Sequence, residues 1–389
     1  MTTRSLFCCS VVALVLGSAA GLAIAQTPPA NPHATPANPH ATPATNPHAQ
    51  APASPHGTPP ASPHQAHGTA PMPASAPSAA AATAAVMTIV AGNGTSGFAD
   101  GVGAAARFNK PIRLAPFGPD AIVVSDIYNH AIRIVSKDGR VRTITGGPDR
   151  KGHADGPSAT ARILSPHGVA TTPDGRILVA EAEGHTLRAI APRAGAPGEY
   201  DVTTLAGTPE TKGNADGPAP AATFNSPHAV LVGADGAVYT PDIGNATIRR
   251  LKDGKVETVA GAAPDTMVYP MDIAWAADGR MVIADAGANR LRTWTAGAPL
   301  GEIAVAGGLA TPHGVASGPD GALYVADMKS QRVLKIDPAG AVTTVAGVAG
   351  EVGSDSRHLN RPAAVLVHAG WLWIADLDNH RITAVPVAR

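Results

Sequence analysis

From residue 87 to the C-terminus, short apolar runs alternate with turn residues, and no segment shows helical periodicity. Val282-Ile283-Ala284 and Tyr324-Val325-Ala326 are typical runs, and Asp-Gly pairs separate many of them. Short apolar runs bounded by turn signals predict β-strands. Because no helical segment connects these strands, the pattern excludes a parallel βαβ sheet and predicts an all-β fold.

The strand pattern recurs as a repeat that opens on a proline. Six copies begin at Pro111, Pro166, Pro227, Pro270, Pro312 and Pro362. The five intervals between the first and last of these prolines average about 50 residues, which is within the range of propeller blades.

A complete copy contains four predicted strands. The first ends at a turn such as Pro173-Asp174-Gly175, where Asp-Gly predicts a type I′ hairpin turn. The second ends in an acid, the third carries an arginine between apolar residues (Arg133 in the first copy), and the fourth is a phrase such as Val141 to Gly146. Four short antiparallel strands in tandem predict a propeller blade.

The two ends of the repeat region complement each other. The sixth copy stops after its third strand, Arg381 to Val385, and the missing fourth-strand phrase stands at Met87 to Gly92. The sequence therefore predicts a six-bladed β-propeller of four-stranded antiparallel blades over 86–389. The N-terminal strand 87–92 is expected to join the last blade, which closes the ring and removes open sheet edges.

Residues 1–25 have the organisation of an export signal. Arg4 precedes an apolar stretch from Leu6 to Leu22, and Ala23-Ile24-Ala25 offers a cleavage site. We therefore expect a secreted or periplasmic protein with no membrane span after signal cleavage; an uncleaved anchor is the alternative. Cys8 and Cys9 lie inside this segment, so the mature chain is expected to have neither disulfides nor thiolate metal ligands.

Residues 26–85 are rich in Pro, Ala, Thr, Ser, Asn and His and contain no charged residue. This composition predicts a disordered linker with polyproline II character. Only His64 and His67 are close enough in such a chain to share a metal ion, so we favour a spacer over weak metal capture. The whole chain has 29 basic and 29 acidic residues without a basic cluster, which argues against nucleic acid as a partner. We also expect the protein to be a monomer.

The repeats resemble NHL repeats across residues 87–389. The phrases that carry the resemblance are Asp126-Ile-Tyr-Asn129-His130 and Asp376-Leu-Asp-Asn379-His380, together with linkers that contain Ala-Asp-Gly. The resemblance implies a six-bladed propeller. It leaves the function open, because propellers of this kind serve as protein-binding scaffolds, ligand binders and enzymes.

An acid ends the second strand of every copy: Asp126, Glu181, Asp242, Asp285, Asp327 and Asp376. One active site does not need six copies, so we interpret these acids as turn-capping residues that hydrogen-bond local backbone. His130 and His380 lie in the following turn and are interpreted as repeat positions as well.

The residue after the opening proline differs between the copies and is therefore more informative about function. Through the six copies it reads Ile112, His167, His228, Met271, His313 and Ala363. Equivalent positions lie at one height around a propeller axis, so three imidazoles are expected to converge on the mouth of the central channel. Three histidines with an open fourth position are typical of catalytic zinc, and Met271 would favour copper. The alternative is that each histidine only hydrogen-bonds the backbone of a neighbouring blade.

The Pro-His pattern is similar to that of the zinc-binding histidines of peptidyl-hydroxyglycine amidating lyases. The histidines of that family come from alternate blades, whereas here they come from the second, third and fifth. The family's catalytic Tyr phrase lies in the third blade, whereas here Tyr128 matches it in the first. The repeats also resemble those of lactonase-type propellers. A lactonase site would bind its divalent metal through carboxylate and Asn ligands instead of histidines.

Two functions follow from the sequence. The first is a module that binds a protein, glycan or small-molecule ligand at the channel mouth, with or without a divalent metal. The alternative is a zinc- or copper-dependent lyase or hydrolase that uses His167, His228 and His313. Catalytic residues beyond these ligands stay unknown.

Overall fold

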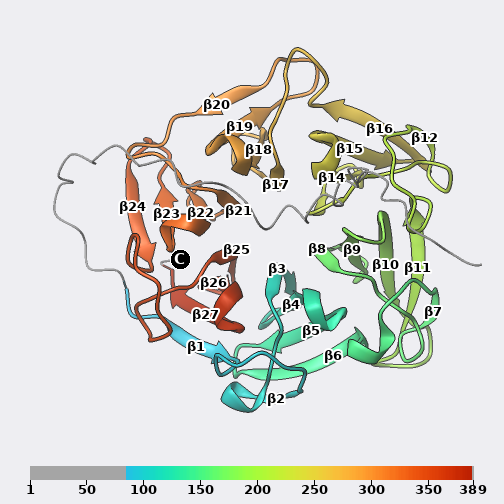
Figure 1. The fold of residues 1–389 in the computed structure, drawn as a ribbon, viewed down its shortest axis with the longest axis horizontal. Helices are drawn as coiled ribbons and strands as arrows, with labels where there is room; N and C mark the ends of the chain where they lie inside the picture. Colours follow the sequence, from blue (N-terminus) through green and yellow to red (C-terminus); the bar gives the residue numbers. More distant parts are fainter. Residues whose placement is uncertain (1–84, 388–389) are drawn as a thin grey trace, which may run out of the picture. The chain divides into compact units, whose positions relative to one another are not determined.

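A computed structural model describes residues 85–387, which form six antiparallel sheets around a central channel (Figure 1). The all-β six-bladed propeller predicted from the repeat is confirmed. The predicted export signal (1–25) and the predicted linker (26–85), apart from its last residue, lie outside the described residues. Within 85–387, no helix combines the length and apolarity needed to cross a membrane.

The first three blades each have four main strands and a two-residue outer strand from the linker that precedes the blade. Blade 1 contains β3 (Pro111–Phe117), β4 (Ala121–Asp126), β5 (Ala131–Ser136), β6 (Arg140–Gly146) and outer β2 (Gly101–Val102). Blade 2 contains β8 (Pro166–Thr171), β9 (Ile177–Glu181), β10 (Thr186–Pro192), β11 (Tyr200–Ala206) and outer β7 (Gly156–Pro157). Blade 3 contains β13 (Leu231–Val232), β14 (Val238–Asp242), β15 (Thr247–Lys252), β16 (Lys255–Ala260) and outer β12 (Gly217–Pro218).

The last three blades have four strands each. Blade 4 contains β17 (Pro270–Trp275), β18 (Met281–Asp285), β19 (Arg290–Trp294) and β20 (Gly301–Ile303). Blade 5 contains β21 (Pro312–Ser317), β22 (Leu323–Asp327), β23 (Arg332–Ile336) and β24 (Val342–Ala346). Blade 6 contains β25 (Pro362–His368), β26 (Trp371–Asp376), β27 (Arg381–Pro386) and β1 (Thr88–Ala91).

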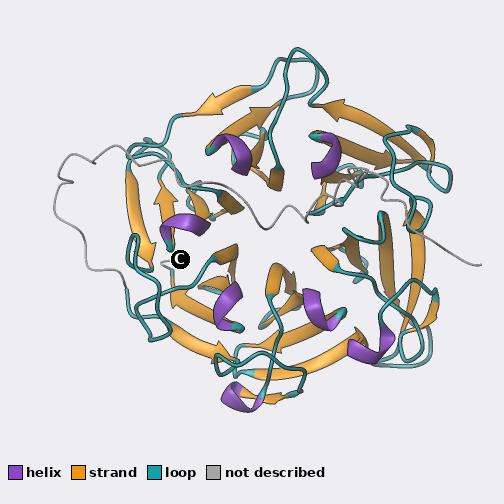
Figure 2. Cartoon of the chain, in the orientation of Figure 1, coloured by secondary structure: helices purple, strands orange, loops and turns teal. Residues whose placement is uncertain are grey.

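Short 3-10 turns accompany the strands (Figure 2). Five of them join the second and third strands of their blades: η2 (Ile127–Asn129), η4 (Ile243–Asn245), η5 (Ala286–Ala288), η6 (Met328–Ser330) and η7 (Leu377–Asn379). Two more lie in linkers: η1 (Gly103–Ala105) and η3 (Pro148–Arg150).

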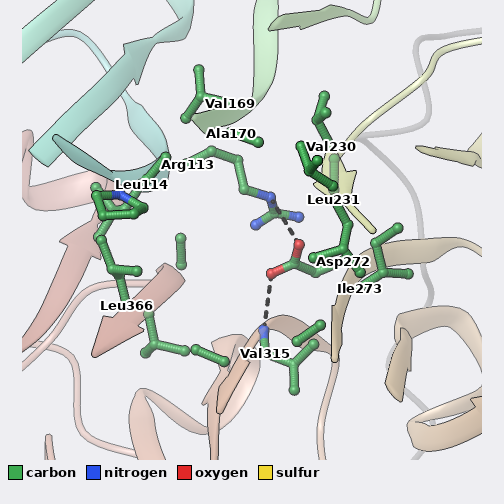
Figure 3. A pocket seen from close by; sticks show the side chains of 18 of the residues that line it. Arg113, Leu114, Val169, Ala170, Val230, Leu231, Asp272, Ile273, Val315 and Leu366 are labelled. Carbon is green, nitrogen blue, oxygen red and sulfur yellow. Dashed lines mark hydrogen bonds and ion pairs between the residues drawn. The ribbon is translucent and has the colours of Figure 1, made fainter. Parts of the chain in front are cut away.

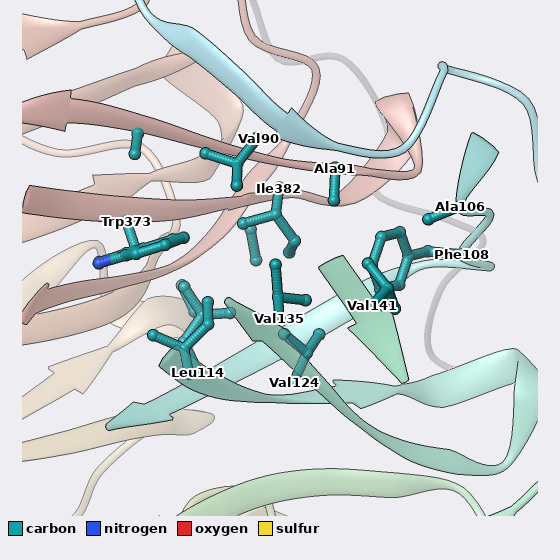
Figure 4. Packing of buried hydrophobic residues seen from close by; sticks show 14 residues of the cluster. Val90, Ala91, Ala106, Phe108, Leu114, Val124, Val135, Val141, Trp373 and Ile382 are labelled. Carbon is teal, nitrogen blue, oxygen red and sulfur yellow. The ribbon is translucent and has the colours of Figure 1, made fainter. Parts of the chain in front are cut away.

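Strand β1 pairs antiparallel with β27, so blade 6 contains strands from both ends of the described chain. Thr88 lies opposite Ala384, and Ala91 lies opposite Ile382. Ala91 also packs into a buried apolar cluster with Ile382 and Trp373 of blade 6 and Val124 of blade 1 (Figure 4). Similar clusters of buried residues lie between the other neighbouring blades. Burial of apolar surface between blades therefore stabilises the ring.

The acids that end the second strands have a structural role, as predicted, but their backbone partners are not in the adjacent turn. Asp126 makes no capping bond to η2. Its Oδ1 accepts the N–H of Asn109 at 2.7 Å, and its Oδ2 accepts bonds from Asn129 at 2.7 Å and Arg133 at 2.9 Å. The equivalent acid of every other blade also accepts the N–H that lies two residues before its opening proline. The acid therefore joins the end of the second strand to the chain entering the blade.

The prediction of type I′ hairpin turns is wrong. In the turn at Gly175 the glycine has a φ of +83°, whereas Asp174 does not have a positive φ. The Gly175 N–H donates to the Thr172 carbonyl at 2.9 Å, as in a type I turn followed by a left-handed glycine. The same bond forms where alanine replaces the proline, from the Gly236 N–H to Gly233 O at 2.9 Å, so the aspartate is the third residue of these turns and has no positive φ.

The residue after each strand-connecting turn forms what we call the inter-blade latch. It is left-handed and directs its side chain to the residue before the next opening proline. His380 Nδ1 accepts the N–H of Lys110 at 3.1 Å, which connects blade 6 to blade 1. The other latch residues with such a bond are His130, His185, Asn289 and Gln331. In blade 3 the position is Ala246, which has no acceptor.

Candidate functional site

The three histidines predicted to converge do lie together in the channel. The ring centroids of His167 and His228 are 4.6 Å apart, and those of His228 and His313 are 5.4 Å apart. Each histidine follows its opening proline, so the repeat places the three at one level, as expected. Their exposed fractions are only 4 to 7%. The imidazoles therefore lie inside the channel and not at an open mouth.

Each of these imidazoles makes a hydrogen bond to a backbone carbonyl through Nδ1. His228 Nδ1 bonds Met271 O at 3.0 Å, and His313 Nδ1 bonds Ala363 O at 2.8 Å, both on the next blade. His167 Nδ1 bonds Ser165 O at 3.0 Å. Because a carbonyl only accepts, all three carry the proton on Nδ1, and Nε2 is the ring atom with the lone pair. The alternative expected from the sequence, a bond to a neighbouring blade's backbone, is confirmed for His228 and His313.

A buried arginine that the sequence analysis did not identify lies beside the imidazoles. Arg113, on β3 of blade 1, donates from Nη1 to Ala363 O at 3.0 Å, and from Nη2 to Met271 O at 2.5 Å and His313 O at 3.1 Å. Its Nη atoms also lie 3.3 Å from Nδ1 of His228 and of His313. Because those Nδ1 atoms already donate to carbonyls, these two approaches are close contacts between donors.

Asp272, on β17 of blade 4, faces Arg113 across the channel (Figure 3). The Arg113 Nε and Asp272 Oδ1 atoms are 3.5 Å apart, and Asp272 Oδ2 accepts the Val315 N–H at 2.9 Å. Burial raises the pKa of Asp272 and lowers that of Arg113, while each partner's charge opposes the shift of the other. An arginine stays protonated in proteins, so the pair is a buried ion pair of zero net charge.

The structure does not identify a metal site at the three histidines. Within residues 85–387, no group of three or more His, Cys, Asp or Glu side chains is placed to hold one. The Arg113 guanidinium lies 3.3 Å from Nδ1 of His228 and of His313, so it adds a positive charge near any cation that these rings would bind. Burial first, with the Arg113 charge as a further cause, holds the pKa values of His228 and His313 well below the usual range. Zinc or copper binding by His167, His228 and His313 stays a prediction.

On the other side of the ion pair the channel widens into a cavity of about 310 Å³, which we call the channel socket. The innermost strands of all six blades contribute to it, and Arg113 and Asp272 form its floor (Figure 3). The larger apolar residues of its lining are Leu114, Val169, Val230, Leu231, Ile273, Trp275, Val315, Val365 and Leu366, but polar and apolar groups contribute about equally to its exposed surface. Trp275 Nε1 donates to Val232 O at 3.0 Å, which fixes the indole at the outer part of the wall.

The repeat alignment contains a signal for this ion pair that we did not use. The residue two after each opening proline reads Arg113, Gly168, Ala229, Asp272, Gly314 and Ala364. The two opposite charges stand three blades apart, and blades 1 and 4 are opposite each other in a ring of six. The small residues have a physical reason as well. A Cβ on Gly168 or Gly314 would come within 2.7 Å of the neighbouring backbone.

The sequence profile of the NHL repeat matches residues 164–190 and 309–336, in blades 2 and 5. The chain is a six-bladed propeller with NHL repeats in blades 2 and 5. NHL repeat-containing protein 2 from Bos taurus is 30% identical over 167 residues, a match that covers 40% of this NHL propeller and 22% of the relative. The NHL propeller thus spans about a fifth of the length of that relative.

Solved structures share the fold of this NHL propeller. An auxiliary nutrient binding protein from Bacteroides ovatus has a TM-score of 0.58 at 17% identity, covering 78% of this chain and 77% of that one. A gluconolactonase from Xanthomonas campestris has a TM-score of 0.52 at 14% identity, covering 72% of this chain and 87% of that one. At these identities the likeness shows the propeller fold alone.

Proposed function

We propose that this NHL propeller is a binding module and that its ligand site is the channel socket. The observation that carries the proposal is a concave cavity on the propeller axis that apolar residues line and that has two buried polar groups at its floor. Small-molecule sites commonly have this composition, with an apolar wall for affinity and a few polar groups for orientation. A volume of about 310 Å³ suits a small molecule or one side chain of a protein partner better than an extended glycan.

The chemistry of the socket favours binding over catalysis. Arg113 is permanently protonated, and Asp272 is already engaged by Arg113 and by the Val315 N–H. Ser317 Oγ donates to the Trp275 carbonyl. The socket therefore presents no activated nucleophile and no available general base among these groups.

The alternative function is a metal-dependent lyase or hydrolase at His167, His228 and His313. The shared Nδ1–H tautomer supports it, because metal-bound histidines commonly donate their other ring N–H to a carbonyl. The Arg113 guanidinium opposes it, since a second cation would bind beside a buried positive charge. We therefore place binding at the socket first.

The proposed site can be tested by filling it. Ala170 is a half-buried residue of the socket wall (Figure 3), and Ala170→Phe should occupy part of the cavity. Titration calorimetry with ethylbenzene, an apolar probe, should show saturable binding to the wild-type protein and loss of that binding in Ala170→Phe. Ala260→Phe is the matched control, because Ala260 is also half-buried but lies on β16, the fourth main strand of blade 3, and does not line the socket. Equal binding by the two variants would place the site elsewhere.

A further inference from the structure

The floor of the channel socket limits the charge that a ligand can carry. Arg113 and Asp272 are the charged residues among those that line the socket, and their charges cancel. The Nη atoms of Arg113 are engaged by backbone carbonyls, and Asp272 Oδ2 is engaged by the Val315 N–H. A carboxylate or ammonium head would lose its hydration here and find no unpaired opposite charge.

A purely apolar ligand would also leave a polar group of the floor without a hydrogen-bond partner. The Nε atom of Arg113 is buried and has no hydrogen-bond partner within the described residues, because Asp272 Oδ1 lies 3.5 Å away. The same is true of Nε in five other arginines of the described residues, none of which lines the socket: Arg133, Arg188, Arg249, Arg250 and Arg292. At the floor, an unpartnered donor therefore lies close to a carboxylate oxygen that can accept a further bond.

We propose that the channel socket selects a small uncharged ligand with an apolar body and a head that both accepts and donates hydrogen bonds, such as a primary carboxamide. The head N–H donates to Asp272 Oδ1. The head carbonyl accepts from Arg113 Nε after a small shift of the guanidinium, because Nε has almost no exposed surface without a ligand. The body lies against the apolar wall, whose outer part includes Trp275 and Leu366. This inference rests on the proposed function, and it adds the end of the channel that is used and the chemical class of ligand.

Four probes with the same aromatic body test this selectivity. Phenylacetamide has the proposed head, phenylacetate carries a negative charge, phenethylamine carries a positive charge, and ethylbenzene has no polar head. Titration calorimetry on the wild-type protein should give phenylacetamide the lowest Kd, by at least about tenfold over each of the others, because a site built to hydrogen-bond a ligand rejects analogues that cannot.

A charge-changing variant provides the second measurement. Asp272→Asn keeps the shape of the side chain but leaves the floor with the positive charge of Arg113, so phenylacetate should gain affinity over phenethylamine. Thermal melting establishes that this variant is folded. If it is not, the ranking in the wild-type protein decides by itself.

The outcomes separate the two proposals. Similar affinities for all four probes, or tighter binding of a charged one, would overturn the ligand class and leave the socket in place if Ala170→Phe still abolishes binding. Absence of saturable binding by all four probes, or binding that Ala170→Phe does not change, would overturn the socket as the ligand site.

Discussion

Arg113 and Asp272 come from opposite blades and meet inside the channel, with Nε and Oδ1 3.5 Å apart. Arg113 also bonds the carbonyls of Met271, His313 and Ala363 on blades 4, 5 and 6. A single side chain on blade 1 thus connects to three other blades and separates the histidine level from the socket. The pair therefore connects blades of the ring to one another and also forms the floor of the proposed site.

We expect Arg113→Met to destabilise the protein by about 3–5 kcal/mol, because Asp272 would stay buried without its countercharge. Three carbonyls would also lose their donor. The double variant Arg113→Met/Asp272→Asn removes the stranded charge and should recover part of the loss. Urea unfolding of the wild type, both single variants and the double variant measures the coupling. Additive losses would show that the two side chains do not stabilise each other.

The inter-blade latch offers a gain of stability at blade 3. Ala246 is left-handed, with φ of +55°, and has no side chain to accept the N–H of Tyr269. Ala246→Asn should raise the free energy of unfolding by about 1 kcal/mol, because it supplies an acceptor and tolerates this backbone conformation. Ala246→Gly is the control that eases the backbone without an acceptor. Equal gains from Asn and Gly in thermal melts would exclude the hydrogen bond as the cause.

The latch between blades 6 and 1 should make stability depend on pH. Burial first, and then the Lys110 charge, lowers the pKa of His380 below 6.5, while Asp378 opposes the shift. The unfolded state therefore binds the proton more tightly, and the contribution of His380 is complete above about pH 6.5 and declines as pH falls through the lowered pKa. Protonation also removes the acceptor for the Lys110 N–H.

His380→Asn keeps an acceptor that does not titrate. The advantage of the wild type over this variant in urea unfolding should shrink as the pH falls from about 8 to about 5. Other histidines titrate in both proteins, so their effects cancel in the difference. A constant difference across this range would contradict the role of His380.

The fold could be predicted because every blade repeats the same burial pattern, so six imperfect copies support one another. The level of His167, His228 and His313 followed from the same repetition. The backbone partner of Asp126 could not be found among its sequence neighbours, because it is the Asn109 N–H, 17 residues earlier. Local capping was the wrong assumption for a residue that joins two distant segments.

The ion pair was missed for the opposite reason. At the position two residues after the opening proline, Arg and Asp each occur in only one of the six copies. A search for residues that recur in every copy therefore does not find them. Their relation appears only when the six copies are placed on a ring, where blades 1 and 4 face each other. The channel socket was missed as well. The size of a cavity depends on how far the side chains of the six innermost strands reach toward the axis, and the sequence pattern does not give that distance.

The pairing of β1 with β27 predicts the effect of a shortened N-terminus. A chain that begins at Gly94 lacks β1 and leaves one edge of β27 unpaired. It also removes Val90 and Ala91 from the apolar cluster between blades 6 and 1. We expect a loss of several kcal/mol and a tendency to aggregate through the open edge. An unchanged melting temperature, relative to a chain that begins at residue 85, would mean that β1 does not contribute to the stability of the ring.

The metal prediction can be tested through Arg113. Its guanidinium lies 3.3 Å from Nδ1 of both His228 and His313, so we expect weak zinc or copper binding by the wild-type protein. Arg113→Gln combined with Asp272→Asn removes the guanidinium charge without stranding a buried carboxylate and retains a donor for the carbonyls, and it should tighten binding of either metal by about tenfold or more. In that background His228→Ala should abolish the gain, whereas His130→Ala, a change at the latch, should leave it intact. Equal metal binding with and without Arg113, or equal losses from His228→Ala and His130→Ala, would remove His167, His228 and His313 from consideration as a metal site. The lyase or hydrolase alternative would fail with it, and ligand binding at the socket would be the function left to pursue.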